Sequence, residues 1–268
     1  MVVNGYINNG GIMNVFITGA TSGIGLEVAK SLSNRGYSVY AGIHTYKQKK
    51  YFDDYPNIKP IKFDITNAND IERIGKLDID ILICHAGIGI GGSISEIPIE
   101  LVRKNFEVNL FSNINLIQKV LKNMIKKGYG KIIITSSLFG ILSYPFLGVY
   151  SATKSSLISV AYALRKEMKM INKSIHISVV LPGAYHTGFN QIMLENKYDF
   201  MNNGTYFYGQ IKKIRKKENL FFKLIEKKEL NSIIKKYVNI VLEDKPKFIY
   251  KAPFLQYFFI KLLYIFKI

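Results

Sequence analysis

Two residues four positions apart, Tyr150 and Lys154, form the pair in this sequence whose chemistry is most direct. They lie near the start of a segment with a strong helical pattern, so their side chains project from one face about one turn apart. A tyrosine with an ordinary pKa of about 10 is a poor base at neutral pH, but a nearby ammonium group favours the phenolate and lowers that pKa. The pair therefore predicts a proton donor and acceptor. Taken alone, the same spacing also occurs in ordinary surface pairs on helices.

A glycine-rich turn precedes the first predicted helix. The stretch VFITGATSGIG, residues 15–25, places three glycines between a predicted strand and that helix. In such a turn the backbone approaches a pyrophosphate closely, and the helix N-terminus supplies positive potential. A tight strand-to-helix turn without a ligand is the alternative. The predicted contact residues of a nucleotide are Gly19, Thr21, Ser22, Gly23, Ile24 and Gly25.

Short β-rich runs alternate with longer helical patterns from residue 14 onward, which is typical of βαβ units and a parallel sheet. We expect seven strands, at 15–18, 38–43, 58–63, 79–84, 131–135, 175–181 and 247–250. The expected helices span 24–34, 67–75, 98–111, 114–127, 150–170 and 228–243. The predicted fold class is α/β, with a single Rossmann-type doubly wound domain over residues 13–251 and a sheet of about seven parallel strands.

Three segments depart from that alternation. Residues 1–12 lack the basic start and the apolar core of a secretory signal, so we expect a loose N-terminal extension, with Met13 as the alternative initiator. Residues 186–228 are polar, aromatic and basic, and they are too long for an ordinary connection, which predicts a lid insertion. Residues 252–268 form an apolar C-terminal segment.

Several motifs in order along the chain resemble those of the short-chain dehydrogenase/reductase family. The turn has the spacing TGxxxGxG, CHAG at 84–87 stands where the family usually has NNAG, and PGAYHT at 182–187 is similar to the PGxxxT segment. Between them lie Asn109, the serine pair at 136–137 and YSATK at 150–154. The resemblance covers roughly residues 14–187 and looks most like the steroid and retinol dehydrogenase branch.

This resemblance implies a catalytic set of Asn109, Ser137, Tyr150 and Lys154. Ser137 follows a predicted strand, where active-site residues of parallel sheets gather, although paired serines also simply end strands. In the family this serine hydrogen-bonds the substrate oxygen, the asparagine helps to hold a water beside the lysine, and the lysine also binds the nicotinamide ribose. The implied cofactor contacts further include Asp64, Ala86, Gly87, Pro182, Gly183 and Thr187.

The residues after the second predicted strand favour NADP over NAD. An acidic residue there binds the ribose 2′-hydroxyl of NAD, whereas a basic residue suits a 2′-phosphate. Ile43 stands where a selecting Asp is expected, and His44 with Lys47 and the Ser22 hydroxyl could receive a phosphate. Asp64 matches the family position that contacts adenine, and its alternative role is to cap the next helix. His85 replaces the second amide of the family motif, and we expect its ring to satisfy buried backbone groups.

The predicted function is that of an NADP(H)-dependent oxidoreductase. It interconverts a carbonyl and an alcohol by hydride transfer, with Tyr150 as general acid and base. The aromatic residues of the lid segment suit a small lipophilic substrate. The alternative is a catalytically silent NADP-binding sensor or scaffold, which the intact catalytic set disfavours. We predict no metal site.

The net charge of +18, from 37 Lys and Arg against 19 Asp and Glu, favours anionic partners, although an AT-rich genome would also enrich lysine. The basic run at 212–217 could contact nucleic-acid phosphates, but a solvated lid helix explains it, and we predict no nucleic-acid partner. The single cysteine, Cys84, excludes an internal disulfide and agrees with a cytoplasmic location.

The C-terminal stretch 254–268 is too short to cross a bilayer, and Lys261 interrupts it. On a helical wheel its apolar residues gather in one arc, which fits an interfacial helix on the acidic inner surface of a membrane. It fits equally well a helix that covers the substrate cleft, or a subunit contact in a homo-oligomer. The residues in the arc are Leu255, Phe258, Phe259, Leu262, Leu263, Ile265 and Phe266.

Overall fold

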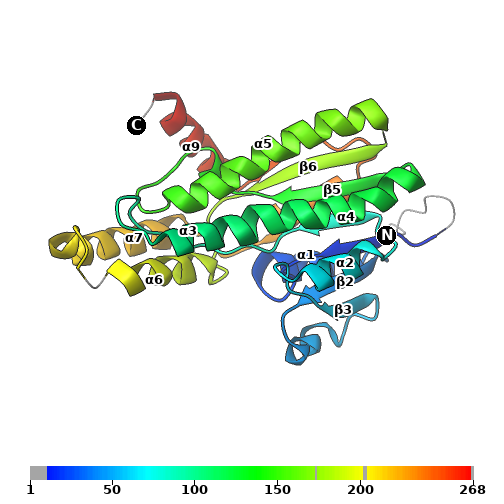
Figure 1. Ribbon diagram of the computed structural model, residues 1–268, viewed down its shortest axis with the longest axis horizontal. Coiled ribbons are helices and arrows are strands. Elements are labelled where there is room, and N and C mark those ends of the chain that lie inside the picture. Colours follow the sequence, from blue (N-terminus) through cyan, green and yellow to red (C-terminus); the bar gives the residue numbers. More distant parts are fainter. Residues whose placement is uncertain (1–10, 173, 202–203, 267–268) are drawn as a thin grey trace.

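A parallel sheet of seven strands forms the centre of the computed structural model, which describes residues 11–172, 174–201 and 204–266 (Figure 1). The strand order is β3-β2-β1-β4-β5-β6-β7. Each strand lies within two residues of its predicted position, so the expected α/β Rossmann-type fold is confirmed. The strands are β1 (Asn14–Ile17), β2 (Ser38–Ile43), β3 (Ile58–Lys62), β4 (Ile81–Cys84), β5 (Gly130–Thr135), β6 (Ile175–Pro182) and β7 (Ile249–Ala252).

The central strands are apolar along their whole length because helices cover both faces of the sheet. The ILIC sequence of β4 is buried at all four positions. One face packs against α1 (Gly23–Ser33) and α8 (Asn231–Leu242), and the other against α2 (Ala68–Gly75), α4 (Ser112–Lys127) and α5 (Gly148–Ile171). This arrangement is doubly wound, as predicted.

The winding reverses beside β1, which pairs with β2 on one side and with β4 on the other. At such a point the loops that follow the two strands lead to opposite faces of the sheet and leave a crevice at its carboxyl edge. The glycine-rich turn after β1 and the loop after β4 therefore lie at the place where α/β folds bind ligands.

The break predicted between two helices at residues 112–113 is absent. The two helices expected at 98–111 and 114–127 are continuous: α3 (Ile99–Phe106) passes through a π-helical turn, η2 (Glu107–Phe111), into α4. The polar pair between the two expected helices, Ser112 and Asn113, bonds within the continuous helix. The Ser112 hydroxyl donates to the Glu107 carboxylate over 2.9 Å, and the Asn113 amide donates to the Val108 and Asn109 carbonyls over 3.1 Å each. Such a turn often marks a functional site.

The predicted lid contains two helices, α6 (Phe189–Met201) and α7 (Ile211–Ile225), joined through the short η4 (Tyr208–Gln210). They project together beyond the carboxyl edge of the sheet (Figure 1). A buried ion pair between Lys197 of α6 and Glu218 of α7 joins them, and the Tyr198 hydroxyl donates to Glu218 over 2.6 Å.

Three short elements complete the described chain: η1 (Tyr46–Phe52), η3 (Leu138–Gly140) and the C-terminal α9 (Phe254–Phe266). Within the described residues, no helix combines the length and the apolar character needed to cross a bilayer. Most of the expected N-terminal extension, residues 1–10, lies outside the described residues, and Ile12 beside it is 67% exposed.

Candidate active site

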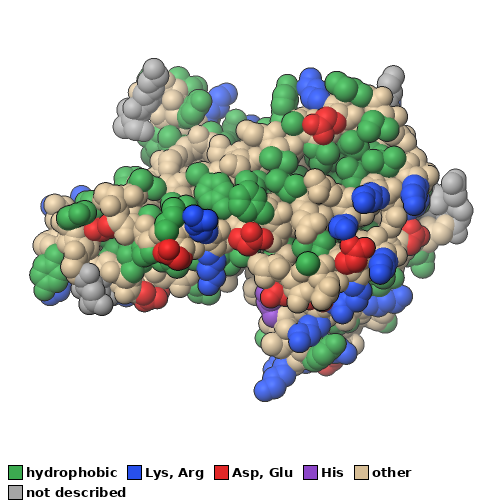
Figure 2. Space-filling view, in the orientation of Figure 1, with side chains coloured by type: hydrophobic (Ala, Val, Ile, Leu, Met, Phe, Trp, Pro, Cys, Tyr) green, Lys and Arg blue, Asp and Glu red, His purple; other side chains and the backbone are tan. Residues whose placement is uncertain are grey.

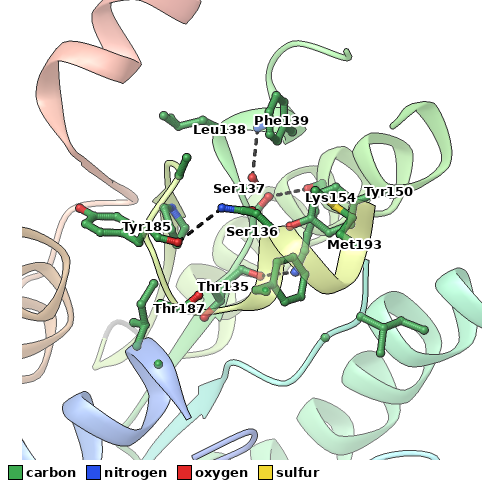
Figure 3. A pocket seen from close by; sticks show the side chains of 18 of the residues that line it. Thr135, Ser136, Ser137, Leu138, Phe139, Tyr150, Lys154, Tyr185, Thr187 and Met193 are labelled. Carbon is green, nitrogen blue, oxygen red and sulfur yellow. Dashed lines mark hydrogen bonds between the residues drawn. The ribbon is translucent and has the colours of Figure 1, made fainter. Parts of the chain in front are cut away.

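A cavity of about 590 Å³ opens at the carboxyl edge of the sheet. One part of its wall comes from the turn after β1 and from the loops that end β4, β5 and β6. The loops after β2 and β3 add His44 and Asp64 to that part, and α3 and η2 also contribute to the wall. The other part comes from the start of α5 and from α6, α7 and α9. Figure 3 shows the residues where the two parts meet, with Ser137, Tyr150 and Lys154 close together. The sheet therefore brings together segments more than a hundred residues apart in the chain.

The glycine-rich turn has the backbone geometry that a close approach requires. Gly19 has φ +67°, and a Cβ there would lie 3.0 Å from the Cα of Ala86. Gly23 has φ +50°, and its Cβ would lie 2.9 Å from the Cβ of Thr187. Both positions therefore need glycine for conformation and for space.

The helix that follows the turn begins at the cavity. Ser22 is the N-cap of α1 and makes no capping hydrogen bond, and Thr21, Ser22 and Ile24 all line the wall. The exposed N–H groups of such a helix end suit a pyrophosphate. Gly25 is different: it is not on the wall, and a side chain there would overlap the Gly19 carbonyl oxygen. Its role is to bring α1 close to the turn.

Tyr150 and Lys154 lie side by side near the start of α5, as their spacing predicts. Their exposed fractions are 5% and 4%. The Lys154 Nζ lies 5.8 Å from the centre of the Tyr150 ring and donates a hydrogen bond to the Thr135 carbonyl over 3.1 Å. The lysine is thus held against the end of β5, beside the tyrosine.

The lowered pKa that was expected for Tyr150 is not found in this structure, because burial outweighs the groups that favour the phenolate. Burial raises the pKa of Tyr150 to about 12, and a hydrogen bond with Ser137 offsets part of that rise. Burial also lowers the pKa of Lys154 to about 8. Both groups lose hydration, which disfavours the charged form of each. Tyr150 is therefore set up as a protonated phenol that can donate.

The two serines after β5 have different partners. The Ser136 hydroxyl donates to the Lys154 carbonyl over 2.7 Å and so joins β5 to α5. The Ser137 hydroxyl accepts from the Phe139 N–H over 3.1 Å, and its interaction with the Tyr150 phenol lowers the pKa of that tyrosine. Of the two serines, Ser137 is therefore the one that acts on Tyr150, and its catalytic role stays a prediction.

Asn109 lies in the π-helical turn and is fully buried. Its Oδ1 accepts from the Ile88 N–H over 2.8 Å, and its Nδ2 donates to the Ile88 carbonyl over 2.9 Å and to Thr153 Oγ1 over 3.1 Å. A Cβ at Gly87 would lie 3.1 Å from Asn109 Oδ1 and 3.3 Å from Lys154 Nζ. Asn109 and Lys154 therefore meet behind Gly87, and Asn109 fixes the loop that follows β4.

The residues expected to select the cofactor are only partly at the cavity. His44 is exposed on its wall. Ile43 is fully buried in the core beneath α1, so the position where we expected a selecting side chain faces away from the cavity. The alternation of side chains along β2 explains this difference, because Val39, Ala41 and Ile43 all point to the same core. Lys47 is exposed in η1 and is not part of the wall.

Asp64 lies on the wall and also has a local structural role. Its Oδ1 accepts from the Thr66 N–H over 2.8 Å and from the Thr66 hydroxyl over 2.7 Å. These two bonds are the main reason that the pKa of Asp64 is lowered, and nearby His44 lowers it further. The cap of α2 is Asn67 rather than Asp64.

We expected the ring of His85 to bond to buried backbone groups. It bonds to side chains instead. Its Nδ1 lies 3.3 Å from Thr135 Oγ1 and 3.3 Å from the Tyr237 hydroxyl, and these two oxygens are 2.8 Å apart. Burial lowers the pKa of His85 to about 4. The ring therefore stays neutral in a network that joins β4, β5 and α8 below Lys154.

Gln256 of α9 is a site residue that the sequence analysis missed. Its Oε1 accepts from the Ala184 N–H over 2.7 Å, and its Nε2 donates to the Ala184 carbonyl over 3.2 Å and to the Ile225 carbonyl over 2.7 Å. Gly183 must be glycine here because a side chain would overlap this amide. The one amide in an apolar tail was the signal that could have revealed it.

Pro182, Gly183 and Thr187 line the cavity beside the turn after β1, and Ala86 and Gly87 line it after β4. All of the predicted site residues except Asn109 and Gly25 are thus on the wall, and these two lie directly behind it. Among the described residues there is no cluster of His, Cys, Asp and Glu that could hold a metal ion.

The family model for short chain dehydrogenases matches residues 13–197. The chain belongs to this family. It is 36% identical over 186 residues to the probable short-chain type dehydrogenase/reductase VdlC of Helicobacter pylori, which covers 67% of this chain and 68% of that protein. It is 30% identical over 185 residues to the NADPH-dependent 3-dehydrocapnine reductase of Ornithobacterium rhinotracheale, covering 64% and 65% of the two chains.

The predicted similarity to steroid dehydrogenases is also confirmed. The human 17-beta-hydroxysteroid dehydrogenase type 1 is 26% identical over 195 residues, 67% of this chain and 59% of that one. The chain therefore spans 59% to 68% of the length of these relatives. A short-chain dehydrogenase/reductase from Burkholderia phymatum, solved with NAD, shares the fold with a TM-score of 0.80 at 17% identity and covers 98% of this chain and 94% of its own. This short-chain dehydrogenase is an oxidoreductase of the class that acts on CH–OH groups with NAD(P).

Proposed function

We propose that this short-chain dehydrogenase uses NADPH to reduce the carbonyl of a small lipophilic substrate, and that it catalyses the reverse reaction with NADP. The observation that carries the proposal is the position of Tyr150 and Ser137. They lie where the polar wall of the cavity, built by strand ends, meets its apolar wall, built by α6, α7 and α9. A carbonyl group at the end of an apolar molecule fits this junction.

The polar wall has the features that hold a dinucleotide. The glycine-rich turn and the N-terminus of α1 would hold the pyrophosphate, and Asp64 would contact the adenine. Lys154 would hold the nicotinamide ribose, and Thr187 would hold the carboxamide. The remaining contacts along the bound dinucleotide would come from Ala86, Gly87, Pro182 and Gly183. When bound, the nicotinamide supplies or takes the hydride.

The chain itself handles the proton. Ser137 would donate a hydrogen bond to the substrate oxygen, and the Tyr150 phenol would give that oxygen its proton as the carbonyl carbon gains a hydride. The raised pKa keeps Tyr150 protonated until the oxygen becomes basic. The Lys154 ammonium, beside the ring, then stabilises the phenolate and returns a proton, while Asn109 holds the loop that closes the back of the site.

The substrate class follows from the other wall. Tyr150 packs in a cluster with Leu147, Met193 and Phe222, and Phe139, Tyr144 and Phe189 border it. These side chains offer few polar groups, so an apolar body of the substrate gains most from burial there.

We further propose that the protein is cytoplasmic and contacts the inner membrane surface through α9.

For the cofactor, we propose NADP because His44 faces the cavity where a 2′-phosphate would lie and no carboxylate of β2 does. The test measures nicotinamide absorbance with NADPH and NADH against a panel of ketones, retinoids and acyl substrates. We expect the parent to prefer NADPH and His44→Asp to shift the ratio of kcat/KM values toward NADH by about tenfold or more, since a carboxylate repels the phosphate.

Gln118→Asp is the matched control because it adds the same charge on the exposed surface of α4. It should leave the cofactor ratio unchanged. A parent protein that already prefers NADH would contradict the cofactor proposal. A protein that binds either dinucleotide but reduces nothing in the panel would contradict the proposed reaction.

A further inference from the structure

Helices α7 and α9 both line the cavity, and we call the side between them its mouth. Phe221 and Ile225 of α7 line the apolar wall, and so do Phe259, Ile260 and Leu263 of α9. Gln256 holds the two helices in one arrangement, because it bonds both the last turn of α7 and the loop after β6. The rim of the mouth is therefore a fixed part of the site.

The outer face of α7 is basic at its start and apolar at its end. Lys213, Lys217, Leu220 and Leu224 follow the spacing i, i+4, i+7 and i+11, which places them on one face. Leu220 is 55% exposed and Leu224 is 75% exposed. They lie directly beside the residues of α7 that line the cavity.

The charge of α7 is one-sided. It carries six Lys and Arg, and its one acidic residue, Glu218, is buried against Lys197. Among the basic residues only Arg215 has a described ion pair, with the exposed Glu195. Most of this positive charge therefore remains available to an anionic surface.

The outer face of α9 has no partner among the described residues. Leu255, Phe258 and Leu262, at i, i+3 and i+7, are 78%, 50% and 36% exposed, and Phe266 is 67% exposed. Figure 2 shows hydrophobic side chains at the surface of the projecting α9 and of the α6–α7 end, with basic side chains near them. The inner face of α9 lines the cavity, which was one of the alternatives that the sequence left open. The exposure of apolar side chains on its outer face therefore needs a separate explanation.

We propose that the outer faces of α7 and α9 dock together on an anionic lipid bilayer, so that the mouth of the cavity opens onto lipid. Exposed apolar side chains would enter the interface, and Lys213, Lys217 and Lys261 would lie at the level of the head groups. The positive charge favours a bilayer over a second copy of this chain, since two copies would bring the basic α7 helices together. The entry of substrate from the bilayer rests on the proposed reaction, but the docking itself does not.

The test is co-sedimentation of the full chain with vesicles of phosphatidylcholine alone and with vesicles that also contain phosphatidylserine. We expect binding to the anionic vesicles that weakens with salt. Leu255→Glu with Phe258→Glu should reduce the partition coefficient at least tenfold, and Lys213→Glu with Lys217→Glu should do the same, since each lysine near anionic lipid contributes about fivefold. The control is Lys169→Glu with Met170→Glu, an equally exposed basic and apolar pair in the last turn of α5, which should bind as the parent does.

Docking is overturned if the parent stays in the supernatant with anionic vesicles, or if the control pair loses as much binding as the other variants. It is also overturned if sedimentation without lipid shows a dimer that the Leu255 and Phe258 changes dissociate, because a second copy would then cover the face. Turnover of a water-soluble ketone separates this proposal from the function: the docking variants should keep the rate of the parent. Vesicle binding by a protein that reduces nothing would leave docking standing and reject the proposed reaction.

Discussion

The polar wall and the apolar wall of the cavity are built in different ways. We call them the cofactor wall and the substrate wall, after the ligands that we propose for them. The cofactor wall consists of backbone and of short polar side chains at strand ends, as when Thr18 Oγ1 accepts from the His85 and Ala86 N–H groups over 2.9 Å each. The substrate wall consists of long side chains on α6, α7 and α9, held together by a buried ion pair and by Gln256. The first wall is fixed by the sheet, whereas the second depends on contacts between helices that project from it.

This difference predicts two kinds of mutant. Changes where the walls meet should remove chemistry and leave the fold intact, because strands on both sides already hold the backbone. Changes within the substrate wall should loosen the wall itself, because few contacts hold it to the sheet. Mutants of both kinds test this contrast.

The largest effect is expected from Tyr150→Phe. The ring still fills its place in the cluster around Leu147 and Met193, but the phenol that donates the proton is lost. We expect kcat to fall by about 10² to 10⁴ while NADP binding and the melting temperature change little. The control is Tyr144→Phe, the same change on the half-buried ring that stacks on Phe221 at 5.3 Å. Near-normal turnover in Tyr150→Phe would show that the proton comes from another group.

The second effect concerns the ion pair inside the substrate wall. Glu218→Leu leaves the ammonium of Lys197 buried without its carboxylate, which should destabilise the packing of α6 on α7 by about 3 to 5 kcal/mol. The double variant Lys197→Met with Glu218→Leu removes both charges and should recover most of that loss. Limited proteolysis within residues 189–225 and chemical unfolding measure the effect. Equal stability of the single and double variants would mean that the pair is not what holds this wall together.

The sequence predicted the cofactor wall well and the substrate wall poorly, for the same physical reason. Close approach of a backbone to a ligand restricts positions such as Gly19 and Gly23 to one residue type, and that restriction is visible in a single sequence. Polar residues at strand ends, such as Ser137, are visible because the strands before them are uniformly apolar. Both features depend on local spacing.

The rest of the site depends on contacts between distant segments. Lys197 and Glu218 each look like an ordinary solvated charge, and only the packing of two helices makes them a buried pair. Ile43 stands where the sequence led us to expect a cofactor-selecting Asp, but the alternation along β2 turns this position into the core. The raised pKa of Tyr150 likewise follows from burial, which the spacing of Tyr150 and Lys154 does not reveal.

The smallest predicted effect tests the underside of the cofactor wall through pH. Burial lowers the pKa of His85 from its usual 6.5 to about 4, so the unfolded chain binds a proton at higher pH than the folded protein does. The stability linked to His85 is therefore fully present above about pH 6.5 and is lost as pH falls toward about 4. Because one face of the ring borders the cavity, we expect the loss to be about 1 to 2 kcal/mol.

His85→Asn places a neutral amide in the network with Thr135 and Tyr237 and should remove this part of the acid sensitivity. The measurement is the free energy of unfolding at about pH 7 and about pH 4.5 for the parent, for His85→Asn and for the exposed control His44→Asn. The decrease between the two pH values should be smaller in His85→Asn and unchanged in the control. Acidic residues contribute equally to the pH dependence of all three proteins. If the free energy of unfolding decreased equally in all three, His85 would take up its proton as readily in the folded protein as in the unfolded chain. The polar network under Lys154 would then be open to water, and the cofactor wall would be less rigid than the contrast between the two walls requires.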